Sequence, residues 1–195
     1  MTTAPVRTQV SGSTFILFVG AGIVGETAFA AVHDNMGNRY GQIGVPQRYA
    51  SDQGELRAFI CSHCRGGEGH TFSLDKTPAL SNWEAVLFAI EVTGSPVLDS
   101  FAQADARAAP LSAGSVATTR AGEVLLLCAL AASYGSPDRY APSADFTLLD
   151  EQTNGSDSLG GADAWALAGP PGRYRGALSS SLASSGAVFL LALAP

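Results

Sequence analysis

The residues best suited to metal or redox chemistry are Cys61, His63 and Cys64, with His70 a short way further along the chain. A structural zinc site needs a second pair of ligands at a regular spacing. The third cysteine, Cys128, lies inside an apolar run and supplies no such pair. Residues three apart on a strand point to opposite faces. We therefore expect Cys61 and Cys64 to be small buried residues, and we expect no metal and no cofactor.

A glycine-rich segment, Gly20-Ala21-Gly22-Ile23-Val24-Gly25, fits the G-x-G-x-x-G pattern of dinucleotide-binding folds. In those folds the glycines let the backbone approach a pyrophosphate at the start of a helix, and an acidic residue follows about 20 residues later. The corresponding segment here, Ile43–Arg48, contains no acid. The pattern therefore favours a glycine-rich loop between strands over an NAD- or FAD-binding enzyme.

Carboxylates are the other candidates for catalysis. Glu84 and Glu91 flank one apolar stretch, but seven residues of strand separate them by about 23 Å and place them on opposite faces, too far apart for a glycosidase pair. Asp34, Asn35 and Asn38 could offer oxygens to Ca²⁺, yet their spacing does not match an EF-hand loop and is typical of a turn. Motifs of serine hydrolases, zinc proteases and P-loop proteins are absent from the sequence. We predict no catalytic residues.

A loop rich in Gly, Ser and Pro carries two tyrosines and two charged residues. Loops bind ligands more often than strands do. The loop therefore suggests a contact site, and tyrosine rings on a surface could stack on sugars. We predict binding residues at Tyr134, Asp138, Arg139 and Tyr140.

Composition limits the kind of protein that must position these residues. The chain has 195 residues, of which 46% are hydrophobic and 14% charged, so it can bury a sizeable core. A net charge of −6 argues against a nucleic-acid partner. The longest apolar runs, Phe15–Val19, Val124–Leu130 and Ala187–Ala194, are shorter than the roughly 20 residues of a membrane helix. We expect no signal peptide, and an odd number of cysteines favours a reducing compartment.

Short β-type runs separated by Gly, Ser, Asn and Pro recur along the chain, whereas helical periodicity is scarce. The first series of predicted strands is Val6–Val10, Thr14–Gly20, Ala28–His33, Arg39–Ile43, Leu56–His63, His70–Leu74 and Trp83–Val92. The second is Ser115–Arg120, Val124–Ala131, Phe146–Leu149, Ala162–Leu167, Arg173–Ser179 and Ala187–Ala194. Between the two, Gly94–Gly114 is predicted to be a connection with some extended structure.

The two series align with each other. Thr8–Leu17 matches Thr118–Leu127, Tyr40–Ile43 matches Phe146–Leu149, Phe59 matches Trp165, His70–Ser73 matches Gly176–Ser179, and Ala85–Phe88 matches Ala187–Leu190. One half of about four or five strands cannot bury its apolar face alone, so the two halves should share one core. We predict an all-β, antiparallel β-sandwich of jelly-roll type built from two pseudo-repeats. Its parts would be a first half (1–94), a connector (95–114) and a second half (115–195), in one compact unit.

Two apolar runs predict how the centre of this sandwich is covered. Phe15–Val19 and Leu125–Leu127 are apolar without alternation, which is typical of a strand buried on both faces. One face would meet the opposite sheet. We expect the second face to be covered by loops or by a partner chain, and hence an assembly.

Several segments resemble a family of two-repeat, jelly-roll-like β-sandwich proteins of bacteria and their phages. The hairpin Asp34-Asn35-Met36-Gly37-Asn38-Arg39-Tyr40 is similar to the "D-x-x-G-N-x-aromatic" hairpin of that family. The resemblance continues in Glu91–Asp99, Thr118–Leu126, Phe146–Glu151 and Gly172–Arg175, and covers nearly the whole chain. Gly20–Gly25 and Cys61–Cys64 depart from the family pattern. The family implies a structural or surface-binding module, often in phage particles, with no catalytic residues.

From this resemblance we expect a non-enzymatic structural protein of a phage virion, either a head decoration (cement) subunit or a tail-associated subunit. Its partners would be major capsid or tail proteins and copies of itself, with no nucleic acid and no membrane. It would be made in the host cytoplasm and located in the virion. The alternative is a carbohydrate-binding, lectin-like surface module that uses the tyrosine loop on a host-surface glycan.

Overall fold

A computed structural model describes the chain except for residues 23–28, 50–53, 78–84, 132–138, 153–158 and 183–184. The described residues form strands and no helix. The strands are β1 (Ser11–Ala21), β2 (Phe29–Asp34), β3 (Gly41–Tyr49), β4 (Gly54–Arg65), β5 (Phe72–Lys76), β6 (Ala85–Val92), β7 (Val97–Ala106), β8 (Ser115–Thr118), β9 (Val124–Ala131), β10 (Tyr140–Pro142), β11 (Thr147–Gln152), β12 (Gly160–Leu167), β13 (Gly172–Arg175), β14 (Leu178–Ser180) and β15 (Gly186–Ala194).

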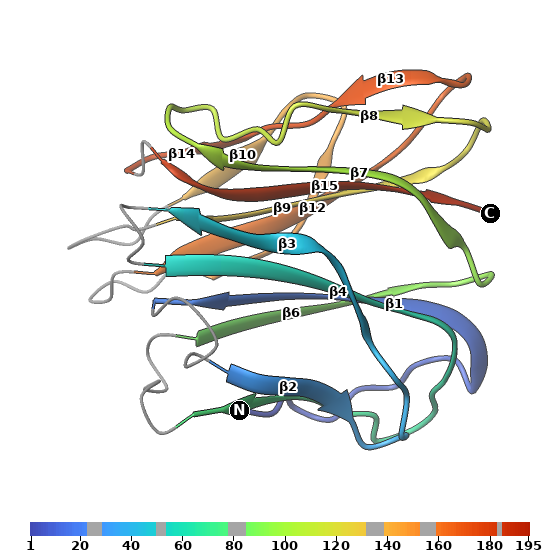
Figure 1. Cartoon of the computed structure of the whole chain (residues 1–195). Helices are drawn as coiled ribbons and strands as arrows, with labels where there is room; N and C mark the ends of the chain where they lie inside the picture. The colour runs from blue at the N-terminus through green and yellow to red at the C-terminus, as the bar shows by residue number, and fades with distance from the viewer. Residues whose placement is uncertain (23–28, 50–53, 78–84, 132–138, 153–158, 183–184) are drawn as a thin grey trace.

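Two main sheets face each other at the centre of the molecule. One has the strand order β3-β4-β1-β6 and the other the order β11-β12-β9-β15-β7, and every pairing is antiparallel. Three two-stranded sheets, β2-β5, β8-β13 and β10-β14, complete the fold. Figure 1 shows the resulting layers, with β2 below the four-stranded sheet and the pairs containing β8 and β10 above the five-stranded sheet. The all-β, antiparallel prediction is confirmed.

The strand pairing within each half of the chain follows a nested pattern. In the first, β1 pairs with β6, β2 with β5 and β3 with β4. In the second, β9 pairs with β15, β10 with β14 and β11 with β12. Strands far apart in the sequence therefore lie side by side at the centre, and strands close in sequence lie outside them.

The core between the two main sheets is continuous and apolar. Ile16, Phe18 and Leu56 from the four-stranded sheet meet Leu126 and Phe189 from the five-stranded sheet. The rings of Phe18 and Phe189 lie 6.4 Å apart between centroids. Each fully buried side chain of this size contributes roughly 1.5–3 kcal/mol of transfer free energy. This layer therefore holds the two sheets together.

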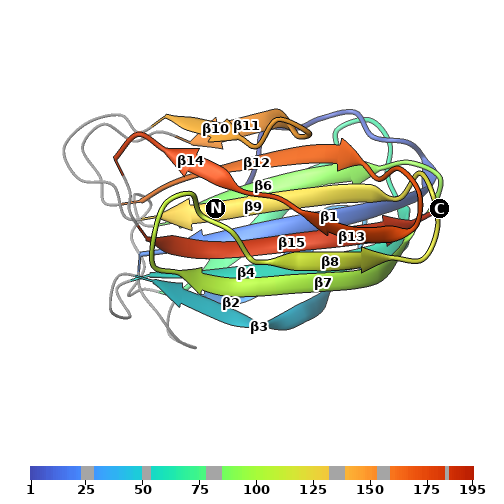
Figure 2. The ribbon, with the colours of Figure 1, turned by 90° about the horizontal axis from the view of Figure 1, so that it is seen from above.

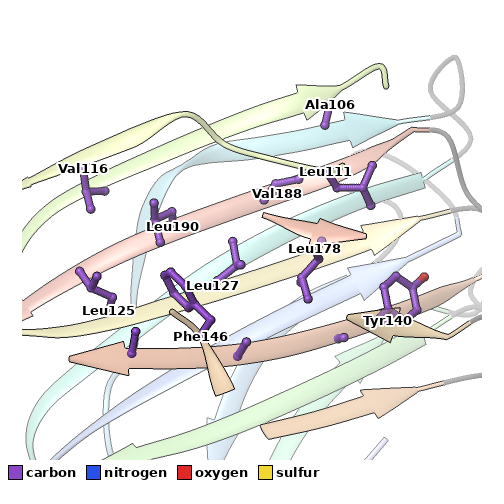
Figure 3. Close-up of a cluster of buried hydrophobic side chains, with 14 of the residues drawn as sticks. Ala106, Leu111, Val116, Leu125, Leu127, Tyr140, Phe146, Leu178, Val188 and Leu190 are labelled. Atoms are coloured by element: carbon purple, nitrogen blue, oxygen red, sulfur yellow. The ribbon is translucent and has the colours of Figure 1, made fainter. Parts of the chain in front are cut away.

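Both central strands are also buried on their outer faces. Figure 3 shows the cluster above the five-stranded sheet, where Leu127 and Leu190 pack beneath Leu111, Phe146 and Leu178. Under the four-stranded sheet, Phe15 and Leu17 pack against Phe72 of the β2-β5 pair. The expectation that loops or a partner chain cover these faces is wrong, because small strand pairs of the same chain cover them. Their burial therefore gives no argument for an assembly.

The segment predicted as a connector carries a strand of its own. Within residues 95–114, β7 pairs along its length with β15 and forms an edge of the five-stranded sheet. The sequence favoured a connection here because the segment is rich in Ala, Ser, Asp and Pro. Near the N-terminus, the predicted strand Val6–Val10 does not form, and Val6 makes an isolated β-bridge with His70.

The glycine-rich segment begins inside β1 and continues between β1 and β2. Gly20 and Ala21 continue β1 and pair with β4 and β6 on either side. A Cβ atom on Gly20 would lie 2.4 Å from Cδ1 of Leu130 and 2.9 Å from Cγ1 of Val86. The glycine therefore lets the two main sheets approach closely. The rest of the motif, from Ile23 to Gly25, lies outside the described residues.

Candidate functional site

The cysteine pair forms a disulfide, contrary to the expectation of two separate thiols. The Sγ atoms of Cys61 and Cys64 are bonded, with 6.1 Å between the Cα atoms. The side chains of Cys61 and Cys64 do not point to opposite faces of β4, because the register of β4 against β1 shifts between them and His63 adopts a φ of 54°. A bulge of this kind reverses which face a side chain points to. Cys128 is buried and free.

Asp34 is the centre of the turn between β2 and β3. These two strands lie in different sheets, so the segment Asp34–Tyr40 is a turn and not the hairpin that the sequence predicted. Its Oδ1 accepts hydrogen bonds from the backbone N–H groups of Met36 and Asn38, at 3.0 Å each. Its Oδ2 accepts from Nδ2 of Asn38 at 2.6 Å and from the hydroxyl of Tyr40 at 2.7 Å. Burial alone would raise the pKa of Asp34, but the hydrogen bonds from Tyr40 and Asn38 outweigh it and hold that pKa below its ordinary value. The turn predicted at these residues is confirmed.

His70 extends this cluster toward the N-terminal segment. It is fully buried, with Nε2 3.1 Å from Oδ2 of Asp34 and Nδ1 2.9 Å from Oγ1 of Thr8. A hydroxyl, an imidazole and a carboxylate in a row can activate a nucleophile. Here Oγ1 of Thr8 also accepts the N–H of Gly67 at 3.0 Å, and the carboxylate is already saturated by the turn. We interpret the row as a clamp that fixes residues 1–8 against β5.

A groove runs along the outer edge of β6. Among the described residues, β6 pairs with β1 on one side only. On its other side lies a hollow of about 460 Å³, lined by Leu87 to Glu91 of β6, by Leu149 and Asp150 of β11 and by Asp163 of β12. Thr3 and Val6 of the N-terminal segment border it from below. Figure 2 shows that β11 lies further out than β6 at this side, so the five-stranded sheet overhangs the edge.

Asp163 is the least satisfied polar group of this groove. It is 2% exposed, lies opposite Cys128 of β9, and its Oδ1 has no hydrogen-bond partner. Burial raises the pKa of Asp163 to about 7, and the like charge of Asp150 adds to the effect, while hydrogen bonds from backbone N–H groups offset only part of it. An unpaired carboxylate oxygen in this setting favours a ligand that donates a hydrogen bond or carries a positive charge.

Leu149 gives the groove an apolar rim. The register of β11 against β12 shifts between Leu148 and Asp150, so Leu149 is the extra residue of a bulge. Bulges often redirect a side chain. Leu149 lines the main hollow and also a second hollow of about 290 Å³, which Ile90 and Trp165 line as well. Leu149 is 47% exposed.

The edges of the two main sheets differ in how well they are protected. On β3, Pro46 and a register shift interrupt the edge, and the Gln103 amide bonds both the N–H and the C=O of Val45. Both β7 and β11 contain register shifts and two acidic residues each. In contrast, β6 pairs with β1 over eight consecutive residues without a shift and carries one charge, at Glu91. Unprotected edges of this kind accept strands from other chains.

The predicted tyrosine loop is only partly described. Tyr134 and Asp138 lie outside the described residues, as does Glu84, so their roles stay predictions. Nη1 of Arg139 donates to Oε1 of Glu151 at 2.6 Å. Tyr140 is 5% exposed and belongs to the outer core cluster, so its ring packs against the sheet and offers no open face for stacking on a sugar.

Sequence reasoning did not single out the groove. Asp163 is the one charged residue of β12, Gly160-Gly161-Ala162-Asp163-Ala164-Trp165-Ala166-Leu167. A lone carboxylate in an otherwise apolar strand was the available signal, because such a residue is costly to bury without a partner.

Comparison of the chain with protein-family models, with curated proteins and with solved structures finds no match. Within the described ranges, His, Cys, Asp and Glu side chains form no group of three or more that could hold a metal ion. In the same part of the chain, no helix is long and apolar enough to cross a membrane.

Proposed function

We propose that this chain is a non-enzymatic structural subunit of a phage virion, as a head decoration (cement) or tail-associated protein held by protein–protein contacts. The observation that carries the proposal is the contrast between a multi-layered apolar core and the regular edge of β6, with which no further strand of the described residues pairs. Every central strand is buried within the chain itself, so the β6 groove is where this scaffold offers backbone hydrogen bonds to another protein.

The strand order supports the family to which the proposal refers. Both halves of the chain contain the nested pattern of three strand pairs described above, and the aligned sequence segments lie on corresponding strands, such as β1 with β9 and β6 with β15. We propose that the chain is a duplicated, jelly-roll-like sandwich.

Two further features support a structural role outside the cell. The disulfide between Cys61 and Cys64 argues against the reducing compartment that the number of cysteines favoured, because disulfides persist on virion surfaces and in other oxidising environments. The cluster of Thr8, His70 and Asp34 uses its hydrogen-bonding groups internally, which supports the absence of catalysis. The proposed partners are major capsid or tail proteins and further copies of the chain.

Mass spectrometry of density-gradient-purified particles from the source culture tests the proposal. We expect the chain to band with the particles in many copies, and its ratio to the major capsid protein then distinguishes head decoration from a tail part. A chain that stays in the soluble fraction contradicts the proposal. The carbohydrate-binding alternative would then be tested on a glycan array with Tyr134→Ala beside the natural chain.

A further inference from the structure

We propose that the groove beside β6 binds an extended segment of a partner protein, which adds to the four-stranded sheet as a fifth strand and places a Lys or Arg side chain against Asp163. The inference deepens the proposed structural role by naming the contact site and the chemistry of its occupant.

The backbone of β6 supplies the first requirement. Its eight residues pair with β1 in unbroken register, so its outer edge presents regularly spaced N–H and C=O groups over about 27 Å. A peptide of about eight residues could bond to this edge in the manner of β-strand addition. At β3 the corresponding groups of Val45 are already bonded to the Gln103 side chain, so that edge is closed.

The walls of the groove supply the second requirement. Strand addition gains specificity from pockets that receive alternate side chains. One row of an added strand would lie under the overhang of β11, against Leu149, Ile90 and Trp165. The opposite row would face Thr3 and Val6 of the N-terminal segment. The occupant should therefore alternate, with apolar side chains on the row beneath β11.

Charge supplies the third requirement. The lining of the main hollow contains three carboxylates, at Glu91, Asp150 and Asp163, and no Lys or Arg among the described residues. The Glu91 carboxylate already accepts hydrogen bonds from the N–H of Gln9 at 2.9 Å and from the Ser13 hydroxyl at 2.6 Å. Asp163 keeps an oxygen without a partner. A basic side chain on the apolar row would satisfy it.

The overhang argues for a single strand rather than a second copy of the chain. A second β6 would arrive with its own β11 on the same side, and two such strands would need the same space above the paired edges. A segment without flanking layers, such as a tail or arm of a partner protein, avoids this conflict.

The experiment selects binders from a phage-displayed library of random linear peptides on the full chain, and maps them by amide hydrogen exchange. We expect the selected peptides to alternate in hydrophobicity, to contain Lys or Arg, and to slow exchange within Ala85–Val92. Leu149→Lys and Asp163→Asn should each weaken binding by about tenfold or more, because the first blocks the apolar row and the second removes the paired charge.

Matched variants control for folding and for general surface effects. Leu167→Lys replaces a leucine of the same sheet that is 62% exposed and lies outside both hollows, and Asp105→Asn replaces a carboxylate on the opposite edge. Both should change binding by less than about twofold. Circular dichroism confirms that each variant keeps its strands.

Three results would overturn the inference. They are a library that yields no binder, protection of β3, β7 or β11 in place of β6, and a dimer of the chain that Leu149→Lys dissociates. The test is separate from that of the proposed function. If the chain is found in particles but neither groove variant weakens its peptide binding, it remains a structural subunit without this contact. A chain absent from particles that still binds basic strands at β6 keeps the contact and loses the virion role.

Discussion

Two buried aspartates, Asp34 at the end of β2 and Asp163 in β12, differ in how completely their carboxylates are hydrogen-bonded. The first accepts four hydrogen bonds from its own turn, and its pKa lies below the ordinary value. The second keeps an oxygen without a partner, and its pKa is raised to about 7. At Asp34 the donors of the turn outweigh the effect of burial, whereas at Asp163 deeper burial and the charge of Asp150 outweigh the backbone donors.

This difference separates a carboxylate that builds the fold from one that is available to a partner. A saturated group such as Asp34 can be replaced only at the cost of every donor that it satisfies. An unsaturated group such as Asp163 is already costly, and its replacement should relieve the folded state. Asp34 thus belongs to the fold, and Asp163 lies at the edge where we propose that a partner strand binds.

The largest effect is expected for Asp34→Ala. The substitution leaves His70 and the donors of Asn38 and Tyr40 without their acceptor inside the protein, so we expect a loss of about 4 kcal/mol of unfolding free energy. Urea denaturation at neutral pH measures it. Asp75→Ala is the matched control, because Asp75 lies on the neighbouring β5, is 57% exposed and faces His33 at 3.5 Å.

The control should change stability by about 0.5 kcal/mol or less, as expected for an exposed pair. If the unfolding free energy of Asp34→Ala also lies within about 1 kcal/mol of that of the natural chain, the turn does not depend on this carboxylate. The distinction between the two aspartates would then disappear.

A stabilisation is expected for Asp163→Asn. The folded-state pKa of about 7 lies above the ordinary value of 3.8 for an aspartate, so the contribution of Asp163 to stability is fully present below about pH 4 and is lost as the pH rises through 7. Asn is neutral at every pH and removes this loss. We expect the variant to exceed the natural chain by about 2–3 kcal/mol at pH 8, and to match it near pH 4.

Urea denaturation at a series of pH values between 4 and 8 measures this difference. Asp105→Asn, on the far edge of the five-stranded sheet, should leave the decline in place. A natural chain whose stability does not fall between pH 4 and 7, relative to Asp163→Asn, would show that Asp163 is charged in the folded state without cost, and that it needs no partner.

The sequence predicted the strands well where the signal is local. The apolar runs in β1, β9 and β15 indicated central strands because their apolar residues do not alternate with polar ones. The Asp34 turn was predictable because all its residues are close in the sequence. The reason for a glycine at position 20 was not visible in the sequence, because Gly20 lies against Leu130 of the other main sheet. The disulfide depends on the bulge at His63, which strand alternation does not foresee.

The groove could not be predicted because three distant segments create it. Strands β6, β11 and β12 meet only after both sheets have formed, and the overhang arises from the number and order of strands in each sheet. The unpaired oxygen of Asp163 is likewise a property of the packed edge. Sequence reasoning can identify a lone carboxylate in an apolar strand, but it cannot say which donors fail to reach it.

The smallest effect is expected for Tyr40→Phe, which removes one of the four hydrogen bonds to Asp34. We expect a loss of about 1 kcal/mol at neutral pH. The depressed pKa of Asp34 means that its contribution is present above the ordinary value and is lost as the pH falls through the folded-state value. Tyr40 is the strongest of the groups that lower this pKa, so acid unfolding of Tyr40→Phe should begin at a higher pH.

Tyr174→Phe is the control for this prediction. It removes a solvent-exposed hydrogen bond to the C=O of Pro170 and should leave the pH of acid unfolding unchanged. If Tyr40→Phe unfolds in acid at the same pH as the natural chain, the N–H groups of the turn alone keep Asp34 ionised. The difference in pKa between Asp34 and Asp163 would then depend on backbone donors.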